Sequence, residues 1–561
     1  MARRGTPTFI VERALVVSAR DEREILVRLE LARQLSNACL GEALRRLDLM
    51  RESLDYARAR AMPKMLGGKN GKKPNKERAA AFAALRHRYG FTSDAISAFG
   101  TRCKNDAKWN EGRSRTDPRV GAHECQRIAE RAFSAVEMYA FGVRGRPRFK
   151  GKGRPVHSLE GKSAGSSICW NAGTGCLEWG GLRLAAMFAP DGRDLWLEQA
   201  LKARTKFARV VWRMVKGERR WFVQLAQEGL VPLKYETVDG ALVGLDVGPS
   251  TIAVYSEQGA GLAPLAPQVQ QPWAAARRIQ RAMNRSRRAT NPQCFNADGT
   301  CKRGAKVAVR SVAYQALRKD LAETERVLEK RRDRSHGALA NRILACGNAL
   351  QGEKLSYKAF QKSFGRSTKV RAAGSLMSKL RRKAERAGGE LRDLDTWSLK
   401  LSQFDHTSGV CTKKALSQRW HVLADDSGVV QRDMYSAFLA AVADKSAIHS
   451  SRALAAWPAA QSLLGRAGWM RPKGLQPVSV ASLLATAPVG FGLPAPERVA
   501  RQRASAIGDA SDVVVERREP KRADGHGPRT PGFSHGEIQR TGDVTKAGHT
   551  RGLAQKPPQS E

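Results

Sequence analysis

The sequence predicts an α+β protein of several domains, and three features of the chain lead to this expectation. The length of 561 residues suggests about three or four domains. Apolar residues at helical spacing over residues 22–62 and 78–141 indicate a helical domain. Runs of β-branched and aromatic residues between turns, at residues 8–18 and 167–227, indicate a β domain.

The β domain contains one well-defined hairpin. Residues 209–215 and 221–227 both have strand composition, and Lys-Gly-Glu-Arg-Arg at 216–220 supplies the turn. A small barrel built from these strands and the N-terminal strand would resemble an oligonucleotide-binding platform. A sandwich fits the same pattern.

The charge balance favours a polyanionic partner. Lys and Arg number 98 against 53 Asp and Glu, which leaves a net charge of +45, so nucleic acid is the expected ligand.

No apolar run reaches the roughly twenty residues of a membrane-spanning helix, so no membrane partner is expected. The N-terminal residues MARRGTPTF lack an apolar signal core, which predicts a cytoplasmic protein. The nine cysteines occur singly and form no CxxC pair, which argues against a disulfide framework.

One carboxylate lies at the turn between two expected strands. In residues 241–256, ALVGLDVGPSTIAVYS, an apolar run ends at Asp246, a Gly-Pro-Ser turn follows, and a second apolar run begins. A buried strand excludes Asp unless the carboxylate is paired or binds a cation, which suggests a metal site. The alternative is an Asp that only caps the turn.

Two further carboxylates extend this hypothesis. Glu353 lies near the middle of an expected strand at 348–357, and Asp433 lies in the first turn of an expected helix within 428–442. Each has a purely local explanation when taken singly. Together with Asp246, in a basic protein, they suggest phosphodiester hydrolysis by two divalent ions about 3.5–4 Å apart. Oxygen ligands of this kind favour Mg²⁺ or Mn²⁺.

Three basic segments are candidates for nucleic-acid binding. Residues 144–155, RGRPRFKGKGRP, contain one aromatic residue for stacking, and two expected basic helices cover residues 273–289 and 310–345. The alternatives are a solvated linker and solvated helix faces. The candidate binding residues are Arg144, Arg146, Arg148, Phe149, Lys150, Lys152, Arg277, Arg278, Arg331 and Arg332.

Three segments, in order, resemble a known family. GLDVGPSTIAV, ACGNALQGEKLSYKAFQKSFGRS, and LSQRWHVL followed by GVVQRDMYSAFLA are similar to the three RuvC-like nuclease motifs of TnpB, the RNA-guided protein of insertion sequences. They are also similar to those of the related small type V CRISPR effectors, and the resemblance covers about residues 8–470. It implies that Asp246, Glu353 and Asp433 are both catalytic residues and magnesium ligands. It also implies two partners, a guide RNA and a double-stranded target DNA with a short flanking motif.

The resemblance also implies a domain plan. An oligonucleotide-binding-like wedge β-barrel takes residues 1–30 and 143–235, interrupted by a helical recognition domain at 31–142. A RuvC-like, ribonuclease-H-like α/β nuclease domain takes 236–445. C-terminal helices are expected at 446–497 and a disordered tail at 498–561.

The chain departs from the family at residues 401–430. The family carries a zinc ribbon here, but Asp405 and Ser408 stand where two of its four cysteines belong, so no zinc is expected. Without the folding energy of a structural zinc, this degenerate insert is expected to be a poorly ordered loop. A metal site made of Asp405, His406, Asp425 and Asp426 is a weak alternative. Tyr435 stands where many relatives place Asn.

The expected function is that of a metal-dependent, RNA-guided endodeoxyribonuclease in the prokaryotic cytoplasm, associated with the nucleoid. One alternative keeps the guided binding without cleavage, as in a repressor. A generic basic RNA-binding protein and the poorly folding product of a decaying gene are the others.

Overall fold

The computed structural model describes residues 6–66, 73–105, 120–152, 154, 156–165, 167–188, 194–305, 309–415, 417–473 and 492–498. The chain divides into two compact units, Met1–Ala504 and Ser505–Glu561, and every described residue belongs to the first. The expected disordered tail lies outside the described residues except for Arg498. Among the described helices, none has both the length and the apolar character needed to cross a membrane.

The N-terminal segments with helical spacing form helices, as predicted. Ser18 caps the start of helix α1, and its side chain accepts a hydrogen bond from the backbone N–H of Asp21. Helix α1 packs against α4 and α5, and buried side chains such as Leu29 and Leu35 form the shared core. A short turn after Arg88 separates α3 from α4, which begins at Ser93. The helices are α1 (Ala19–Glu52), α2 (Leu54–Ala61), α3 (Lys76–Arg88), α4 (Ser93–Asn105) and α5 (Ala122–Ala140), and a short hairpin, β2 (Met65–Leu66) and β3 (Lys73–Pro74), lies between α2 and α3.

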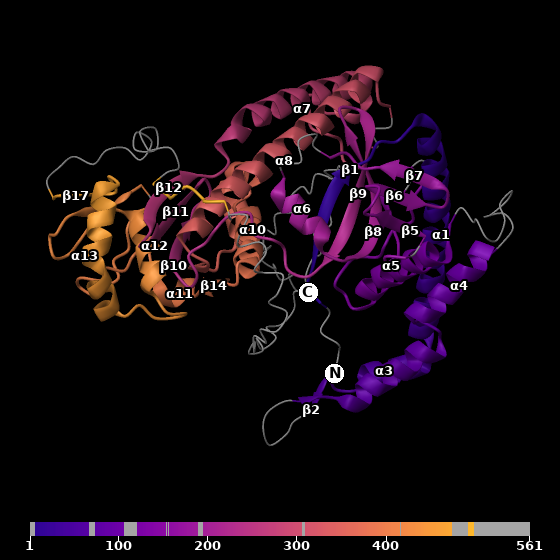
Figure 1. Ribbon diagram of the computed structural model, residues 1–561, viewed down its shortest axis with the longest axis horizontal. Helices are drawn as coiled ribbons and strands as arrows, with labels where there is room; N and C mark the ends of the chain where they lie inside the picture. Colours follow the sequence, from indigo (N-terminus) through magenta and orange to yellow (C-terminus); the bar gives the residue numbers. More distant parts are fainter. Residues whose placement is uncertain are drawn as a thin grey trace, which may run out of the picture. The chain divides into compact units, whose positions relative to one another are not determined.

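The β segments form a four-stranded sheet in the order β1-β9-β8-β4 and a three-stranded sheet in the order β5-β6-β7 (Figure 1). An isolated bridge between Leu15 and Ala186 joins the end of β1 to the end of β7. The two sheets therefore meet at one edge, while the oligonucleotide-binding-like barrel stays a prediction. The elements are β1 (Thr8–Ala14), β4 (Ser158–Glu160), β5 (Ile168–Asn171), β6 (Cys176–Trp179), β7 (Leu182–Ala185), α6 (Leu195–Lys202), β8 (Thr205–Val215) and β9 (Glu218–Glu228).

Strands β8 and β9 form the predicted hairpin, with a tighter turn than expected. Only Lys216 and Gly217 separate the strands, with φ of 54° and 82°. Two consecutive positive φ angles are typical of the turn whose twist matches that of the flanking strands, and glycine adopts the second angle without steric cost. The remaining residues of the predicted turn belong to β9.

A second sheet of five strands has the order β12-β11-β10-β13-β14. Strands β10, β11 and β12 are antiparallel neighbours, whereas β13 runs parallel to β10 and β14 runs parallel to β13. The strand, turn and strand predicted around Asp246 are β10 and β11. The strands are β10 (Leu242–Val247), β11 (Thr251–Ser256), β12 (Gly259–Pro264), β13 (Ala349–Glu353) and β14 (Glu390–Leu394).

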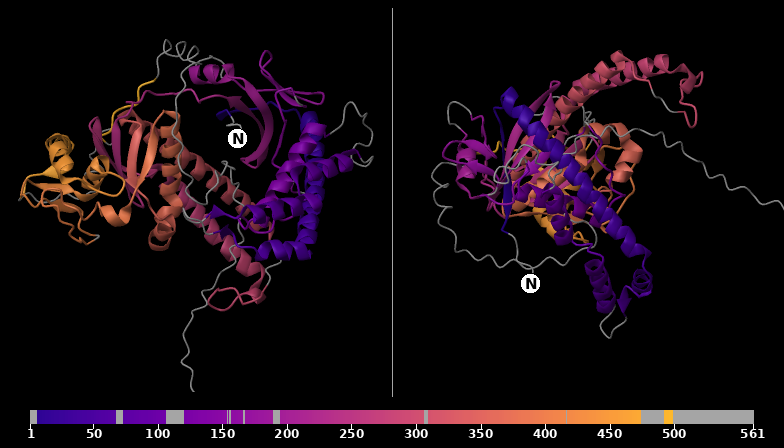
Figure 2. Two further views of the ribbon diagram at one scale, coloured as in Figure 1. Left: turned by 90° about the horizontal axis from the view of Figure 1, so that it is seen from below. Right: turned by 90° about the vertical axis from the view of Figure 1, so that its right-hand side faces the viewer.

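Helices cover both faces of this sheet, and the alternation of side chains along β10 sorts its residues between them. Val243, Leu245 and Val247 pack in one core with α8 and α10, while α12 packs against the opposite face of β10, β11 and β13. Figure 2 shows the sheet and its helices from two further directions. The helices of this part of the chain are α7 (Gln270–Thr290), α8 (Val312–Cys346), α9 (Tyr357–Arg371), α10 (Ala373–Arg386), α11 (Thr396–Leu399), α12 (Arg432–Val442) and α13 (Ser450–Arg466), with short 3₁₀ turns η2 (Pro267–Val269) and η3 (Pro292–Cys294).

The expectation of a poorly ordered loop at residues 401–430 is wrong. Strands β15 (Trp420–Val422) and β16 (Val429–Gln431) pair there, and β17 (Met470–Arg471) adds a third strand. His406 and His421 are buried, and the apolar core of the insert is continuous with that of α12 and α13. Packing and buried hydrogen bonds therefore order this segment without cysteine ligands.

Candidate active site

The three predicted carboxylates lie at corresponding ends of adjacent elements. Asp246 is the penultimate residue of β10, and Glu353 is the last residue of β13. Glu353 therefore lies at the strand end, not near its middle as the sequence pattern predicted. Leu245 pairs with Gly352 in the parallel ladder, so Asp246 and Glu353 are the next residues on neighbouring strands. Asp433 lies in the first turn of α12, as predicted.

Two contacts show that Asp246 and Glu353 face α12. A Cβ on Gly244 would lie 1.9 Å from the carbonyl oxygen of Ala437, so this glycine lets α12 lie directly on β10. The amide of Gln351 donates to the carbonyl of Ala441, also on α12, at 3.3 Å. Residues two apart on a strand share a face, so the carboxylates that follow these two residues point to the side of the helix.

The electrostatics of Asp246 reflect this crowding. Burial, and after it the neighbouring carboxylates of Asp433 and Glu353, hold the pKa of Asp246 well above its usual value. The guanidinium of Arg432 and a hydrogen bond from Ser436 oppose this rise. The site thus concentrates negative charge at the first turn of a helix, where the backbone dipole partly offsets it.

Glu353 and Asp433 are partly accessible, as is Asp246. Burial raises the pKa of Glu353, and the backbone N–H of Leu401 opposes the rise. The Asp433 side chain is 23% exposed, and its Oδ1 lies 3.7 Å from Nε of Arg432. Both groups are half-buried, so solvent and a ligand can reach them.

This donor set fits divalent ions that are shared with a phosphate. In the described part of the chain, no three His, Cys, Asp or Glu side chains lie close enough to hold one ion. The carboxylates therefore do not form a cage that supplies every metal ligand from the protein. Mg²⁺ commonly takes only one or two carboxylates and completes its octahedral shell with water and substrate phosphate oxygens. Mutual repulsion at Asp246 is what a bound cation would relieve.

The predicted basic segment covers residues 144–155, and within it the described stretch of residues 144–152 lies along α1. The amide of Asn37 bonds both the backbone N–H and the carbonyl of Lys150, at 3.0 and 2.8 Å. Phe149 is 58% exposed, and its ring lies 3.6 Å from the position that a Cβ on Gly41 of α1 would take. The side chains of this segment extend into solvent, although Arg146 makes an exposed ion pair with Asp48 at 3.3 Å. Arg144, Arg148, Lys150 and Lys152 are also exposed.

The basic residues of α7 and α8 fall into two groups. Arg277 and Arg278 on α7 are exposed, as is Arg331 on α8. Arg332 instead donates to the carbonyls of Lys369 and Val370, at 3.3 and 3.4 Å, and so it stabilises the C-terminal turn of α9. Helices α7 and α8 pack side by side (Figures 1 and 2).

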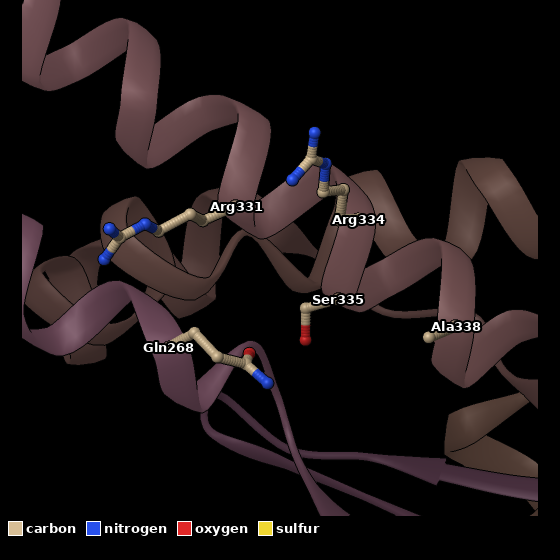
Figure 3. A pocket seen from close by; sticks show the side chains of 5 residues that line it. All are labelled: Gln268, Arg331, Arg334, Ser335 and Ala338. Carbon is tan, nitrogen blue, oxygen red and sulfur yellow. The ribbon is translucent and has the colours of Figure 1, made fainter. Parts of the chain in front are cut away.

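An open cavity of about 430 Å³ lies where α8 meets η2 (Figure 3). Arg331 and Gln268 line it together with Arg334, Ser335 and Ala338. In Figure 3 the Arg334 guanidinium points away from Gln268. The sequence-based prediction included Arg331 but missed Gln268, because only the tertiary structure brings η2 to α8.

The weak alternative of a metal site in the insert is not supported. Asp405 and His406 are buried and hydrogen-bonded, whereas Asp425 and Asp426 are exposed. Tyr435 is 1% exposed, and its hydroxyl contacts His406. Its role beside Asp433 is therefore packing and hydrogen bonding within the protein.

No protein-family model and no curated protein matches this chain. Solved structures that are similar to it include the following two. A cryo-EM structure of a Cas12f1–sgRNA–target DNA complex has 11% identity and a TM-score of 0.40, and the match covers 77% of this chain and 98% of that one. A cryo-EM structure of a CRISPR–Cas12f ternary complex has 13% identity and a TM-score of 0.25, over 77% of this chain and 83% of that one. TM-scores below 0.5 do not establish a common fold, so the residues of the site have to support any functional conclusion.

Proposed function

We propose that this protein is a metal-dependent, RNA-guided DNA endonuclease of the TnpB type. The observation that carries the proposal is the convergence of three carboxylates, Asp246, Glu353 and Asp433, at one end of a sheet and on the side of one helix. A protein that only bound nucleic acid would gain nothing from these carboxylates, because they would repel a phosphate unless cations intervened.

The order of the sheet supports a ribonuclease-H-like nuclease domain. Three antiparallel strands are followed by two parallel ones, with β10 at the centre, and this agrees with the fold that the motif resemblance implies. Helix α12 then brings the third carboxylate to the end of the central strand. The chain's own segments therefore support the domain assignment independently of the solved structures.

Three carboxylates of the site would bind metal ions, and two neighbouring residues would support them. Asp246, Glu353 and Asp433 would hold Mg²⁺ or Mn²⁺, which when bound would activate a water and stabilise the leaving oxygen. Ser436, whose hydroxyl donates to the carbonyl of Arg432 at 3.1 Å, lies close enough to Asp246 to lower the pKa of its carboxyl. Arg432 lies beside Asp433 and adds a positive charge that would stabilise charge developing on a phosphate bound at these carboxylates.

The proposed partners are a guide RNA and a double-stranded target DNA. The net charge of +45 supports a large polyanionic ligand, and the exposed arginines of residues 144–148 and of α7 supply phosphate contacts. In such a complex, base pairing reads the target sequence while the protein reads duplex shape and a short flanking motif.

The test is cleavage of a plasmid library with randomised flanks by the full chain, co-expressed with RNA from its own locus. We expect Mg²⁺-dependent depletion of matched targets that Asp246→Asn and Glu353→Gln abolish. Asp55→Asn, which removes an exposed carboxylate on α2, is the charge-matched control and should cleave normally. Guided DNA binding without depletion would instead support a nuclease-silent repressor, and RNA binding without DNA recognition a generic RNA-binding protein.

A further inference from the structure

A fully exposed tryptophan lies beside the carboxylate site. Trp397 belongs to the short helix α11, and its side chain is 87% exposed. Helix α11 follows β14 (Figure 1). Strand β14 runs parallel to β13, with Leu394 opposite Glu353. Both strands end at this edge of the sheet, so α11 begins where the carboxylates lie.

Several contacts hold the turn that carries Trp397 against the strand of Glu353. The hydroxyl of Thr396 donates to the carbonyl of Lys354, the residue after Glu353, at 3.3 Å. The N–H of Leu401, four residues beyond Trp397, faces the Glu353 carboxylate. The carboxylate of Asp395 accepts from the backbone N–H of Trp397 at 3.2 Å. The tryptophan is therefore presented on an ordered turn that also contacts a proposed metal ligand.

Exposed lysines surround this turn, and their backbones contact it. The N–H of Asp395 donates to the carbonyl of Lys445, and the N–H of Lys400 donates to the carbonyl of Thr396. Lys354, Lys400 and Lys445 are all exposed. A large aromatic ring in water, on a turn whose backbone contacts exposed lysines and next to a carboxylate site, offers both stacking and phosphate contacts.

We propose that Trp397 is a base-stacking residue for the strand to be cut. Its indole ring would stack on an unpaired nucleobase, and Lys354, Lys400 and Lys445 would bind the flanking phosphates. Bases within a duplex are already stacked on both sides, so the ring selects a single-stranded segment. This proposal rests on the proposed nuclease function for its role in positioning a phosphate near Asp246, but the binding itself does not depend on cleavage.

The test measures binding in the full chain carrying Asp246→Asn, by fluorescence anisotropy of a labelled single-stranded oligonucleotide at several salt concentrations. Trp397→Ala should weaken binding about tenfold, and by the same factor at every salt concentration, because stacking releases no counterions. Trp397→Phe should recover most of the affinity. Leu54→Ala, which truncates a side chain that is 76% exposed on α2, is the control and should bind like the parent.

Lysine variants test the second half of the proposal. Lys445→Gln should reduce the salt dependence of single-strand binding by about 0.7 in the slope of log K against log salt. Unchanged affinity for Trp397→Ala, or an equal loss with duplex DNA, would overturn the stacking role. The outcomes separate the two proposals. If Trp397→Ala weakens single-strand binding but the protein with an intact site does not cleave DNA, only the nuclease proposal is refuted. If that protein cleaves DNA and Trp397→Ala binds the single strand normally, only the stacking proposal is refuted.

Discussion

Asp405 holds the insert together by accepting four hydrogen bonds at a buried site. Its carboxylate accepts from the ring Nε2 of His421 at 3.0 Å, from the backbone and hydroxyl of Thr407 at 2.9 and 2.7 Å, and from the backbone N–H of Ala424 at 3.1 Å. Lys414 bonds the other ring nitrogen of His421. The carboxylate therefore connects distant parts of a segment that the sequence predicted to be a poorly ordered loop.

We expect Asp405→Ala to lower the free energy of unfolding by about 3–5 kcal/mol, because it leaves buried donors without an acceptor. Chemical denaturation measures this, provided that unfolding of the insert is resolved from the rest of the chain. Asp425→Ala, at an exposed position, is the control and should change stability by less than about 0.5 kcal/mol. Equal stability of the two variants would contradict the role of the buried network.

His406 and Asp405 make the stability of the insert sensitive to acid. Burial lowers the pKa of His406, so its unfolded form binds a proton more readily, and stability falls as the pH drops below about 6.5. Hydrogen bonds from His421 and Thr407 outweigh burial and lower the pKa of Asp405, so further stability is lost below about pH 4. The Tm should fall between pH 8 and pH 5, a range that includes the ordinary pKa of histidine at about 6.5. His406→Gln should remove most of this pH dependence of the Tm. A Tm independent of pH in the parent protein would contradict this assignment.

At the scale of elements, Gly244 sets the distance between α12 and β10. Replacement by Ala would place a methyl group against the Ala437 carbonyl and the Ala441 N–H, both backbone atoms that cannot rotate away. We expect Gly244→Ala to cost at least about 2 kcal/mol and to reduce cleavage, because α12 carries Asp433. Gly337→Ala on α8 meets no atom within 4 Å and should instead stabilise the protein by about 0.5–1 kcal/mol. Equal Tm values for both variants would contradict the close packing of α12 on β10.

Local patterns predicted most elements, and tertiary contacts account for what they missed. Helix and strand patterns located α1, α8, β10 and α12. In α1 the buried side chains recur at helical spacing, whereas α12 is buried on nearly every side. The insert was mispredicted because its order comes from hydrogen bonds between residues far apart in sequence, such as Asp405 and His421. The sequence did not predict Trp397 as a binding residue, because the exposure of a side chain depends on the tertiary fold.

The carboxylate site was predicted in composition but not in geometry. The types and order of Asp246, Glu353 and Asp433 were visible in the sequence, and the parallel pairing of β10 with β13 brings the first two together. No local pattern shows that Arg432 and Ser436 act on Asp246, because α12 reaches β10 only through long-range packing. In the same way, Arg332 looks like a binding residue in the charge pattern but stabilises the end of α9.

At the scale of the whole molecule, the excess of positive charge is divided between arginines that are free to bind phosphate and arginines that hold the fold. The exposed side chains of Arg144, Arg146 and Arg148 belong to the first kind, since even the pair of Arg146 with Asp48 is solvent-exposed and weak. Replacing all three by Gln should reduce the salt dependence of single-stranded RNA binding by about 2 in the slope of log K against log salt. The Tm of the protein should change by no more than about 2 °C, because exposed charges contribute little to stability.

A control with the same change in net charge separates local contacts from the general field of a +45 protein. Arg183, Lys202 and Arg204 are equally exposed, and replacing them by Gln removes three charges outside the basic segment. If binding depends on local phosphate contacts, this control keeps the parent slope, since only displaced counterions at the contacted phosphates change it. Equal slopes for the two triple variants would mean that the net charge alone, rather than the segment held along α1, determines RNA affinity.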